Sequence, residues 1–174
     1  MSVSLEIERK FLICCPEQKE LRQRCQRIWE IRQTYLKAED PAVTLRLRMR
    51  SQNEICQYFR TEKRRVSDCS CQEKEELISR ETYFQMLASV PTLGRTICKT
   101  RYCLPWEEHV FEIDIYDFWK NTATMEVELA REEEAFSFPP GIRILAEVTG
   151  DRRFSNASLA REIPDVSEYL TEKR

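Results

Sequence analysis

Hydrophobic and polar residues alternate in several short stretches of this chain. In residues 5–13 (LEIERKFLI), 43–50 (VTLRLRMR), 110–116 (VFEIDIY) and 123–131 (ATMEVELAR), apolar side chains recur at about every second position, with charged or polar ones between them. Side chains two residues apart in a β-strand point to the same face, so this pattern predicts amphipathic strands. Apolar stretches with less regular alternation predict further strands at 31–37, 55–63, 73–79 and 95–104.

Helical segments are expected between and after these strands. Pro16 opens a helix-like segment to about residue 28, and Ser79 precedes another that runs through about residue 89. Residues 132–138 predict a short helix that ends before two prolines, and residues 156–161 predict a helical tail. Residues 142–149 fit either a strand or a helix. About eight strands in nearly sequential order indicate an α+β, mainly β fold, an antiparallel meander or closed barrel rather than βαβ units.

The charged faces of these strands carry like charges side by side. The sets that share a face are Glu6 and Glu8 (with Lys10), Arg46, Arg48 and Arg50, Lys99 and Arg101, Glu112 and Asp114, and Glu126 and Glu128. The simplest interpretation is a sheet with one face in water, but such a face is expected to mix signs for cross-strand pairing. Two carboxylates about 7 Å apart repel by roughly 2 kcal/mol at an effective dielectric of 20. A bound cation would relieve that repulsion.

A barrel closed with these charges inward would enclose a wet tunnel. Its carboxylates would suit Mg²⁺ or Mn²⁺, its guanidinium groups would suit phosphate, and helices would cover the aliphatic outer face. A tunnel that offers both kinds of group suits a metal-complexed polyanion. Phosphoryl transfer needs little more than metals, cations and an activated water.

Composition narrows the function classes further. The 174 residues suit a single domain over residues 1–174, and 28 basic against 30 acidic residues leave a net charge of −2, which disfavours nonspecific nucleic-acid binding. The chain has no apolar run long enough to cross a membrane, and its first dozen residues carry charges where a signal peptide would be apolar. We therefore expect a cytoplasmic protein with no membrane partner.

Cysteine and histidine usage disfavours two other kinds of site. The eight cysteines include no C-x-x-C pair, so reduced, partly buried thiols are expected rather than disulfides or structural zinc. His109 is the single histidine, which leaves a histidine-based catalytic triad without support.

The motifs, taken together, resemble the CYTH, or triphosphate tunnel metalloenzyme, superfamily. Residues 6–10 (EIERK) match its E-x-E-x-K signature, and the resemblance continues in the same order to residue 156. It runs through IRQTYL at Tyr35, TLRLR at Arg46 and Arg48, TEK at Lys63, KTRY at Lys99 and Arg101, FEIDIY at Glu112 and Asp114, MEVEL at Glu126 and Glu128, and EVTGDRRFSN at Arg153. Arg152 stands where many relatives have lysine.

The resemblance implies a fold, a reaction and roles for individual residues. It implies an eight-stranded antiparallel tunnel with helices outside, and divalent-metal-dependent hydrolysis of a triphosphate, most often inorganic tripolyphosphate. The implied metal ligands are Glu6, Glu8, Asp114, Glu126 and Glu128, with Glu112 as a further acid. The implied phosphate-binding residues are Arg46, Arg48, Lys63, Lys99, Arg101 and Arg153. Lys10 matches the signature lysine, and Tyr35 resembles the tyrosine that some members pair with it as a dyad tuning activity with pH; with Glu6 and Glu8 they are the implied catalytic residues. Glu73 and Glu75 match a second inward acidic pair.

Several functions remain open at this stage. Thiamine triphosphatase and adenylate cyclase activities belong to the same superfamily, and a noncatalytic polyphosphate-binding module would need the basic residues without the carboxylates. A lipocalin-like barrel would instead place aliphatic side chains inside. The expected partner is a small-molecule triphosphate, and a homodimer is possible by analogy with relatives.

Overall fold

The structure, a computed structural model, describes residues 4–171 as one antiparallel sheet with short helices around it. The sheet has nine strands in the order β5-β4-β3-β2-β6-β7-β8-β1-β9. The strands are β1 (Ser4–Cys14), β2 (Arg27–Leu36), β3 (Thr44–Gln52), β4 (Ile55–Arg65), β5 (Ser70–Ile78), β6 (Ile97–Trp106), β7 (His109–Tyr116), β8 (Thr122–Glu128) and β9 (Ile144–Glu147). The helices are α1 (Gln18–Arg24), α2 (Arg80–Ser89), the 3₁₀ turn η1 (Arg152–Phe154), α3 (Asn156–Leu159) and α4 (Ser167–Leu170).

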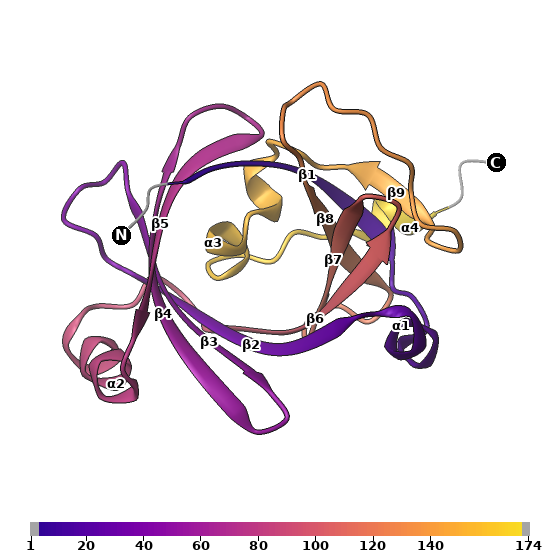
Figure 1. Ribbon diagram of the computed structural model, residues 1–174. Coiled ribbons are helices and arrows are strands. Elements are labelled where there is room, and N and C mark those ends of the chain that lie inside the picture. The colour runs from indigo at the N-terminus through magenta and orange to yellow at the C-terminus, as the bar shows by residue number, and fades with distance from the viewer. Residues whose placement is uncertain (1–3, 172–174) are drawn as a thin grey trace.

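Strand β1 closes the sheet into a barrel because it pairs along both of its edges. Residues 4–7 pair with β5, and residues 8–14 pair with β8. The short β9 adds to the free edge of β1 at residues 11–13. Figure 1 looks along the ring that results. The predicted eight-stranded antiparallel barrel is confirmed, with β9 as one additional strand.

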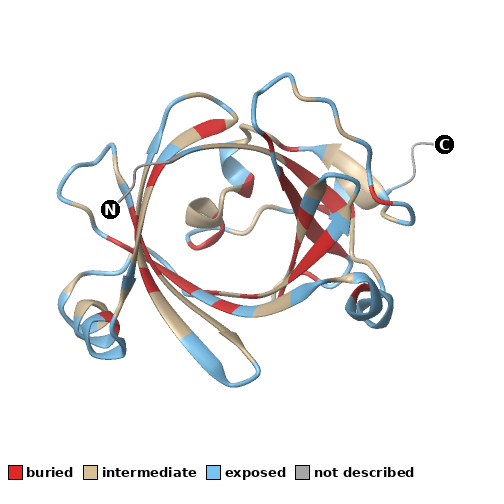
Figure 2. Cartoon of the chain, in the orientation of Figure 1, coloured by how far each residue is buried: buried red, intermediate tan, exposed pale blue. Residues whose placement is uncertain are grey.

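Alternation along the strands sorts charged and apolar side chains between the two faces. On β1, the even-numbered residues Glu6, Glu8 and Lys10 line the interior, while Phe11 and Ile13 belong to the outer core. Helix α1 covers that core through Leu21, and α2 covers the β3–β4 region through Tyr83. Buried segments alternate with less buried ones along the barrel wall (Figure 2). The charged interior is confirmed, and it excludes the lipocalin-like alternative.

Two of the predicted helices differ from the structure. The helix expected over 16–28 ends at Arg24, because residues 27–33 pair with β6 and extend β2 toward the N-terminus. The helix expected over 132–138 is wrong, since these residues form a turn followed by irregular chain. Phe136 and Phe138 pack edge-on against Phe11 there, so tertiary contacts determine the conformation of the segment. The undecided segment 142–149 contains strand β9.

Helix α3 lies across one end of the barrel rather than outside it. In Figure 1 it is seen within the ring, and residues 155–158 line the cavity inside. The Tyr116 hydroxyl donates to Asn156 Oδ1 at 2.9 Å, and Leu12, Ile97 and Phe154 belong to the apolar cluster at this end. The C-terminal segment therefore plugs one end of the tunnel.

Two further findings bear on earlier expectations. None of the helices in residues 4–171 is long and apolar enough to cross a membrane. All eight cysteines lie in this described part of the chain, and all are free thiols.

Candidate functional site

The barrel encloses a cavity of about 1180 Å³ whose wall is mostly charged. The predicted site residues that line it are Glu6, Glu8, Lys10, Tyr35, Arg46, Arg48, Lys63, Glu73, Glu75, Lys99, Arg101, Glu112, Glu126 and Glu128. They come from strands β1 to β8, and each faces inward because of its parity in its strand. The structure thus brings nearly all of the predicted site residues together.

The acidic wall of the cavity is formed by β1, β7 and β8. Glu8 lies directly opposite Glu128 in the β1–β8 ladder, a position where like charges repel. Glu126, together with burial, raises the pKa of Glu8, although Lys63 and Lys10 act in the other direction. Burial, with Glu6 and Glu112, raises the pKa of Glu128. In the part of the chain that the structure describes, neither Glu8 nor Glu128 has an ion-pair partner.

The basic wall is built on strand β3. Arg46, Arg48 and Arg50 alternate along this strand and all line the cavity. Burial and the neighbouring guanidinium groups lower the pKa of Arg48 to about 10, with Glu75 opposing the change. Nε of Arg46 and Nε of Arg48 are buried without a hydrogen-bond partner among residues 4–171. Buried donors without acceptors are rare in folded proteins, so they indicate a place for an anion.

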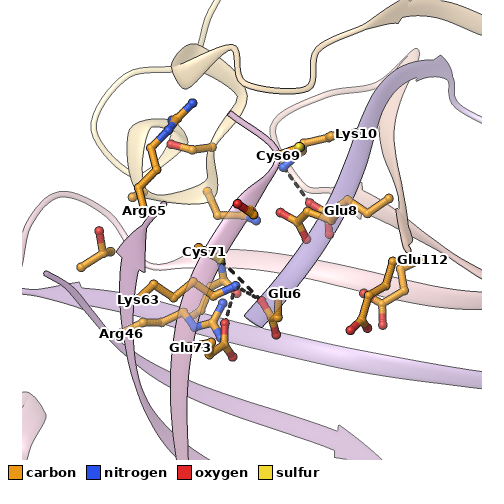
Figure 3. A pocket seen from close by; sticks show the side chains of 18 of the residues that line it. Glu6, Glu8, Lys10, Arg46, Lys63, Arg65, Cys69, Cys71, Glu73 and Glu112 are labelled. Atoms are coloured by element: carbon orange, nitrogen blue, oxygen red, sulfur yellow. Dashed lines mark hydrogen bonds and ion pairs between the residues drawn. The ribbon is translucent and has the colours of Figure 1, made fainter. Parts of the chain in front are cut away.

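Lys63 joins the acidic and basic walls. Its ammonium donates to Glu6 Oε2 at 2.7 Å and also forms an ion pair with Glu73. Figure 3 shows these three side chains pointing toward one another near Arg46, with Glu112 farther to the right. Glu73 Oε1 also lies 3.5 Å from Nη2 of Arg46.

A second ion-pair network fills the wall between β6 and β8. Asp114, which is fully buried, accepts from Lys99 at 2.5 Å and from Nε and Nη2 of Arg101, each at 2.7 Å. Arg101 also reaches Glu126 at 3.0 Å. Burial and Arg101 lower the pKa of Lys99 to about 8, against the attraction of Asp114. Arg101 and Lys99 hold the pKa of Asp114 below its usual value although burial opposes this.

Lys10 and Tyr35 have separate partners in the structure. The Lys10 ammonium lies 2.8 Å from Glu126 Oε1. Burial acts to lower the pKa of Lys10, but Glu126 and the other nearby anionic groups raise it overall. The Tyr35 hydroxyl accepts from Gln33 Nε2 at 3.0 Å, and burial raises its pKa. The expected pairing of Lys10 with Tyr35 therefore remains a prediction.

Two predicted site residues lie away from the cavity surface. Asp114 is buried behind Lys99 and Arg101. Arg153, whose side chain is 60% exposed, binds Asp151 at 2.7 Å, while its neighbour Arg152 lines the cavity. The pair lies in the 3₁₀ turn η1, where the two-residue alternation of a strand does not apply.

Besides Arg152, three arginines that line the cavity were not among the predicted site residues. Arg50 lies between the rings of Trp29 and Phe59, with its Cζ 4.7 Å and 4.5 Å from the two centroids. Its parity with Arg46 and Arg48 was the available signal. Arg65 continues the parity of Lys63, and Arg161 follows helix α3. No pattern in the sequence places Arg161 near the lumen.

The carboxylates of the acidic wall are suitable ligands for a hard divalent cation. They supply oxygen donors, and Glu8 and Glu128, which lie opposite each other in the ladder, have no ion-pair partner in the described chain. In residues 4–171, no three His, Cys, Asp or Glu side chains are already arranged as a metal site. The donor set is suitable, and its members would have to converge on an ion.

Comparison with known proteins gives a consistent set of matches. The profile of the CYTH domain family matches residues 4–156. An inorganic triphosphatase of Nitrosomonas europaea is 36% identical over 162 residues, which cover 91% of this chain and 99% of that protein. The crystal structure of the inorganic triphosphatase NE1496 has a TM-score of 0.57 at 31% identity and covers 92% of this chain and 97% of its own.

A more distant structure supports the fold alone. A Hippeastrum protein described as an adenylyl cyclase with a dominant triphosphatase activity has a TM-score of 0.55 at 14% identity. The match covers 73% of this chain and 81% of that one.

Proposed function

The chain belongs to the CYTH domain family, and from this premise we propose that it is a divalent-metal-dependent triphosphatase acting on inorganic tripolyphosphate. The products would be pyrophosphate and orthophosphate. The relative from Nitrosomonas europaea, an inorganic triphosphatase, supports this choice of reaction.

One observation carries the proposal, namely that carboxylates gather on one wall of the cavity and guanidinium groups on another. Burial and nearby carboxylates raise the pKa of both Glu8 and Glu128 on one wall, while burial and the neighbouring Arg46 and Arg50 lower the pKa of Arg48 on the other. A cation relieves the first wall and a polyanion relieves the second. A triphosphate with its bound divalent metal carries both charges in one ligand.

Each wall then has a role in the proposed reaction. The cationic side chains of the cavity bind the phosphate oxygens and hold the chain of phosphates in line; they are Arg46, Arg48, Lys63, Lys99 and Arg101. Arg152, which lines the cavity, takes the phosphate-binding role that the family resemblance implies for Arg153. The carboxylates of Glu6, Glu8, Glu126 and Glu128 hold Mg²⁺ or Mn²⁺. When bound, the metal supplies charge neutralisation and polarisation of the phosphoanhydride bond.

Other residues of the site prepare these groups. Asp114 orients Arg101 and Lys99 from behind, and Lys10 keeps Glu126 ionised by holding its pKa well below its usual range against the effect of burial. Tyr35 contributes a hydroxyl at the closed end of the lumen. The cytoplasmic location and the homodimer remain predictions.

The rival functions make different products or none. An adenylate cyclase would release a cyclic nucleotide from ATP, and a thiamine triphosphatase would prefer thiamine triphosphate over tripolyphosphate. A noncatalytic module would bind tripolyphosphate without hydrolysing it. Chromatography of the products from tripolyphosphate, thiamine triphosphate, ATP and pyrophosphate, each with Mg²⁺ and with Mn²⁺, separates these outcomes.

The Glu8→Gln variant tests the role of the acidic wall. We expect phosphate release from tripolyphosphate to fall by at least about a hundredfold, because the amide removes one anionic metal ligand. Binding of tripolyphosphate in EDTA, measured by calorimetry, should be retained, since Glu8 repels the anion. The matched control is Glu76→Gln, which removes the same charge from a residue outside the cavity. Turnover in Glu8→Gln equal to that of the control would contradict the proposal.

A further inference from the structure

A carboxylate of the protein itself occupies the guanidinium cradle of β3. Nη2 of Arg48 donates to Glu75 Oε2 at 2.6 Å, and the Thr61 hydroxyl donates to the same oxygen at 3.0 Å. Nη2 of Arg46 lies 3.5 Å from that oxygen and also donates to Thr61 at 3.2 Å. Three donors from β3 and β4 therefore converge on one oxygen of a side chain from β5.

Glu75 satisfies this cradle only in part. With Glu75 in place, the buried Nε atoms of Arg46 and Arg48 still lack an acceptor within residues 4–171. A guanidinium group binds best to an anion that accepts from two of its nitrogens at once. A phosphate group offers more oxygens than a carboxylate and can reach donors on both arginines. The cradle is therefore built for an anion larger than the one that occupies it.

Glu75 also has room to leave, unlike Asp114 and Glu73, two other carboxylates that pair with arginine inside the barrel. Its side chain is 27% exposed and lies at the cavity surface. Asp114, which holds Arg101, is completely buried, and Glu73 is 7% exposed and bound to Lys63. Rotation of Glu75 into the lumen frees Arg48 and Thr61 without burying a new charge.

We infer that Glu75 is an internal competitor for phosphate, a residue that must leave the cradle before a phosphate group can enter. The inference rests on the proposed function in naming phosphate as the ligand. The apparent affinity for any anion in the cradle is reduced by the fraction of molecules in which Glu75 is displaced. Anions that make few other contacts, such as the product orthophosphate, then bind too weakly to block the site, whereas a metal-complexed triphosphate still binds.

The Glu75→Asp variant tests displacement separately from charge. Aspartate keeps the negative charge but is one methylene shorter, so it no longer reaches Arg48. We expect pyrophosphate and tripolyphosphate to bind about tenfold more tightly than to the wild type, by a similar factor for both, because each must displace the same group. Calorimetry in EDTA at fixed ionic strength measures both affinities. A purely electrostatic role for Glu75 predicts no change in this variant, although Glu75→Gln would tighten binding under either mechanism.

Controls distinguish competition by Glu75 from a purely structural role of this residue. Glu76→Asp, with the same change outside the cavity, should bind both anions as the wild type does. Without anion, Glu75→Asp should unfold at a lower temperature than the wild type, while its stabilisation by pyrophosphate should be larger. A merely structural residue would weaken both properties.

Each remaining outcome has one meaning. Equal or weaker anion binding by Glu75→Asp overturns the inference, and so does the absence of any binding by both proteins. Tighter binding by the variant, combined with a wild type that hydrolyses nothing, supports the inference and overturns the proposed function.

Discussion

Asp114 is the acid at the centre of a buried ion-pair network. It is fully buried, and its two oxygens accept from Lys99 and Arg101. Ions buried in this way cost several kcal/mol to desolvate, a cost that only their mutual attraction offsets. Removing Asp114 leaves Lys99 buried without its ion-pair partner, while Arg101 keeps Glu112 and Glu126.

Asp114→Asn should therefore destabilise the protein strongly. We expect the free energy of unfolding to fall by about 3–5 kcal/mol, because the buried Lys99 loses its ion-pair partner and Arg101 loses one of its three. Urea denaturation followed by tryptophan fluorescence measures this change. The comparison variant is Asp151→Asn, which weakens a solvent-exposed pair with Arg153 and should cost no more than about 1 kcal/mol. Equal effects of the two substitutions would show that the buried network does not stabilise the fold.

At this scale the sequence predicts the face of a residue but not its depth or its partner. Parity correctly placed Arg46 and Glu128 in the lumen. It could not place Asp114 behind the wall, because depth depends on the register that aligns Asp114 with Arg101 across the β6–β7 hairpin. It also could not choose Arg152 over Arg153, since these residues lie outside any strand.

Helix α3 shows how an element too short to be stable alone is held in place. Its four residues would not form a helix in isolation. Ser155 caps its start by accepting from the Ser158 amide, and Arg95 donates its amide to the Ala160 carbonyl at 2.7 Å just after its end. Gly94 makes this approach possible, because a Cβ there would lie 2.2 Å from the Ala160 oxygen.

Gly94→Ala should loosen the plug at this end of the barrel. The substitution adds the strain of a positive φ of 89° and a clash with backbone, which together should cost about 2–4 kcal/mol. Hydrogen exchange should accelerate in residues 152–161 more than in β3 and β4. Gly141→Ala is the matched control, since it has a similar φ of 82° but meets only the Arg24 side chain, at 3.7 Å. The same exchange pattern in both variants would contradict a plug held by Gly94.

Elements with clear alternation were predicted well, and elements defined by tertiary contacts were not. The amphipathic strands around Glu8 and Arg48 lie close to where the pattern predicts them. The segment 132–138 has helix-forming residues, but contacts of Phe136 and Phe138 with Phe11 keep it irregular. The position of α3 inside the ring depends on contacts such as Tyr116 with Asn156, which no local pattern reports.

For the molecule as a whole, the acidic wall trades stability for the ability to bind a cation. Glu8 and Glu128 face each other across β1 and β8; Glu126 and burial raise the pKa of Glu8, and burial with Glu6 and Glu112 raises that of Glu128. An acid whose pKa is higher in the folded state binds more protons there than in the unfolded chain. The contribution of these two groups to stability should therefore decrease as the pH rises through the range above about 4.5, where they ionise.

Glu128→Gln should stabilise the protein when no divalent cation is present. We expect a gain of about 0.5 kcal/mol at pH 7 in EDTA and a smaller loss of stability between pH 4.5 and 7 than in the wild type. Added Mg²⁺ or Mn²⁺ should raise the melting temperature of the wild type and have less effect on the variant. Thermal unfolding by circular dichroism measures both trends, and a variant less stable than the wild type in EDTA would refute this account of the acidic wall.

The double pairing of β1 has a consequence for how the protein is made. This strand leaves the ribosome before its partners, since β8 ends at Glu128 and β9 ends at Glu147. During translation the nascent chain therefore carries an unpaired, half-apolar edge until more than a hundred further residues have emerged, and such edges invite association with other chains. The two acids of β1 meet those of β8 only at that late point, so an incomplete polypeptide has no assembled centre and gains its chemistry in one step, when the ring closes.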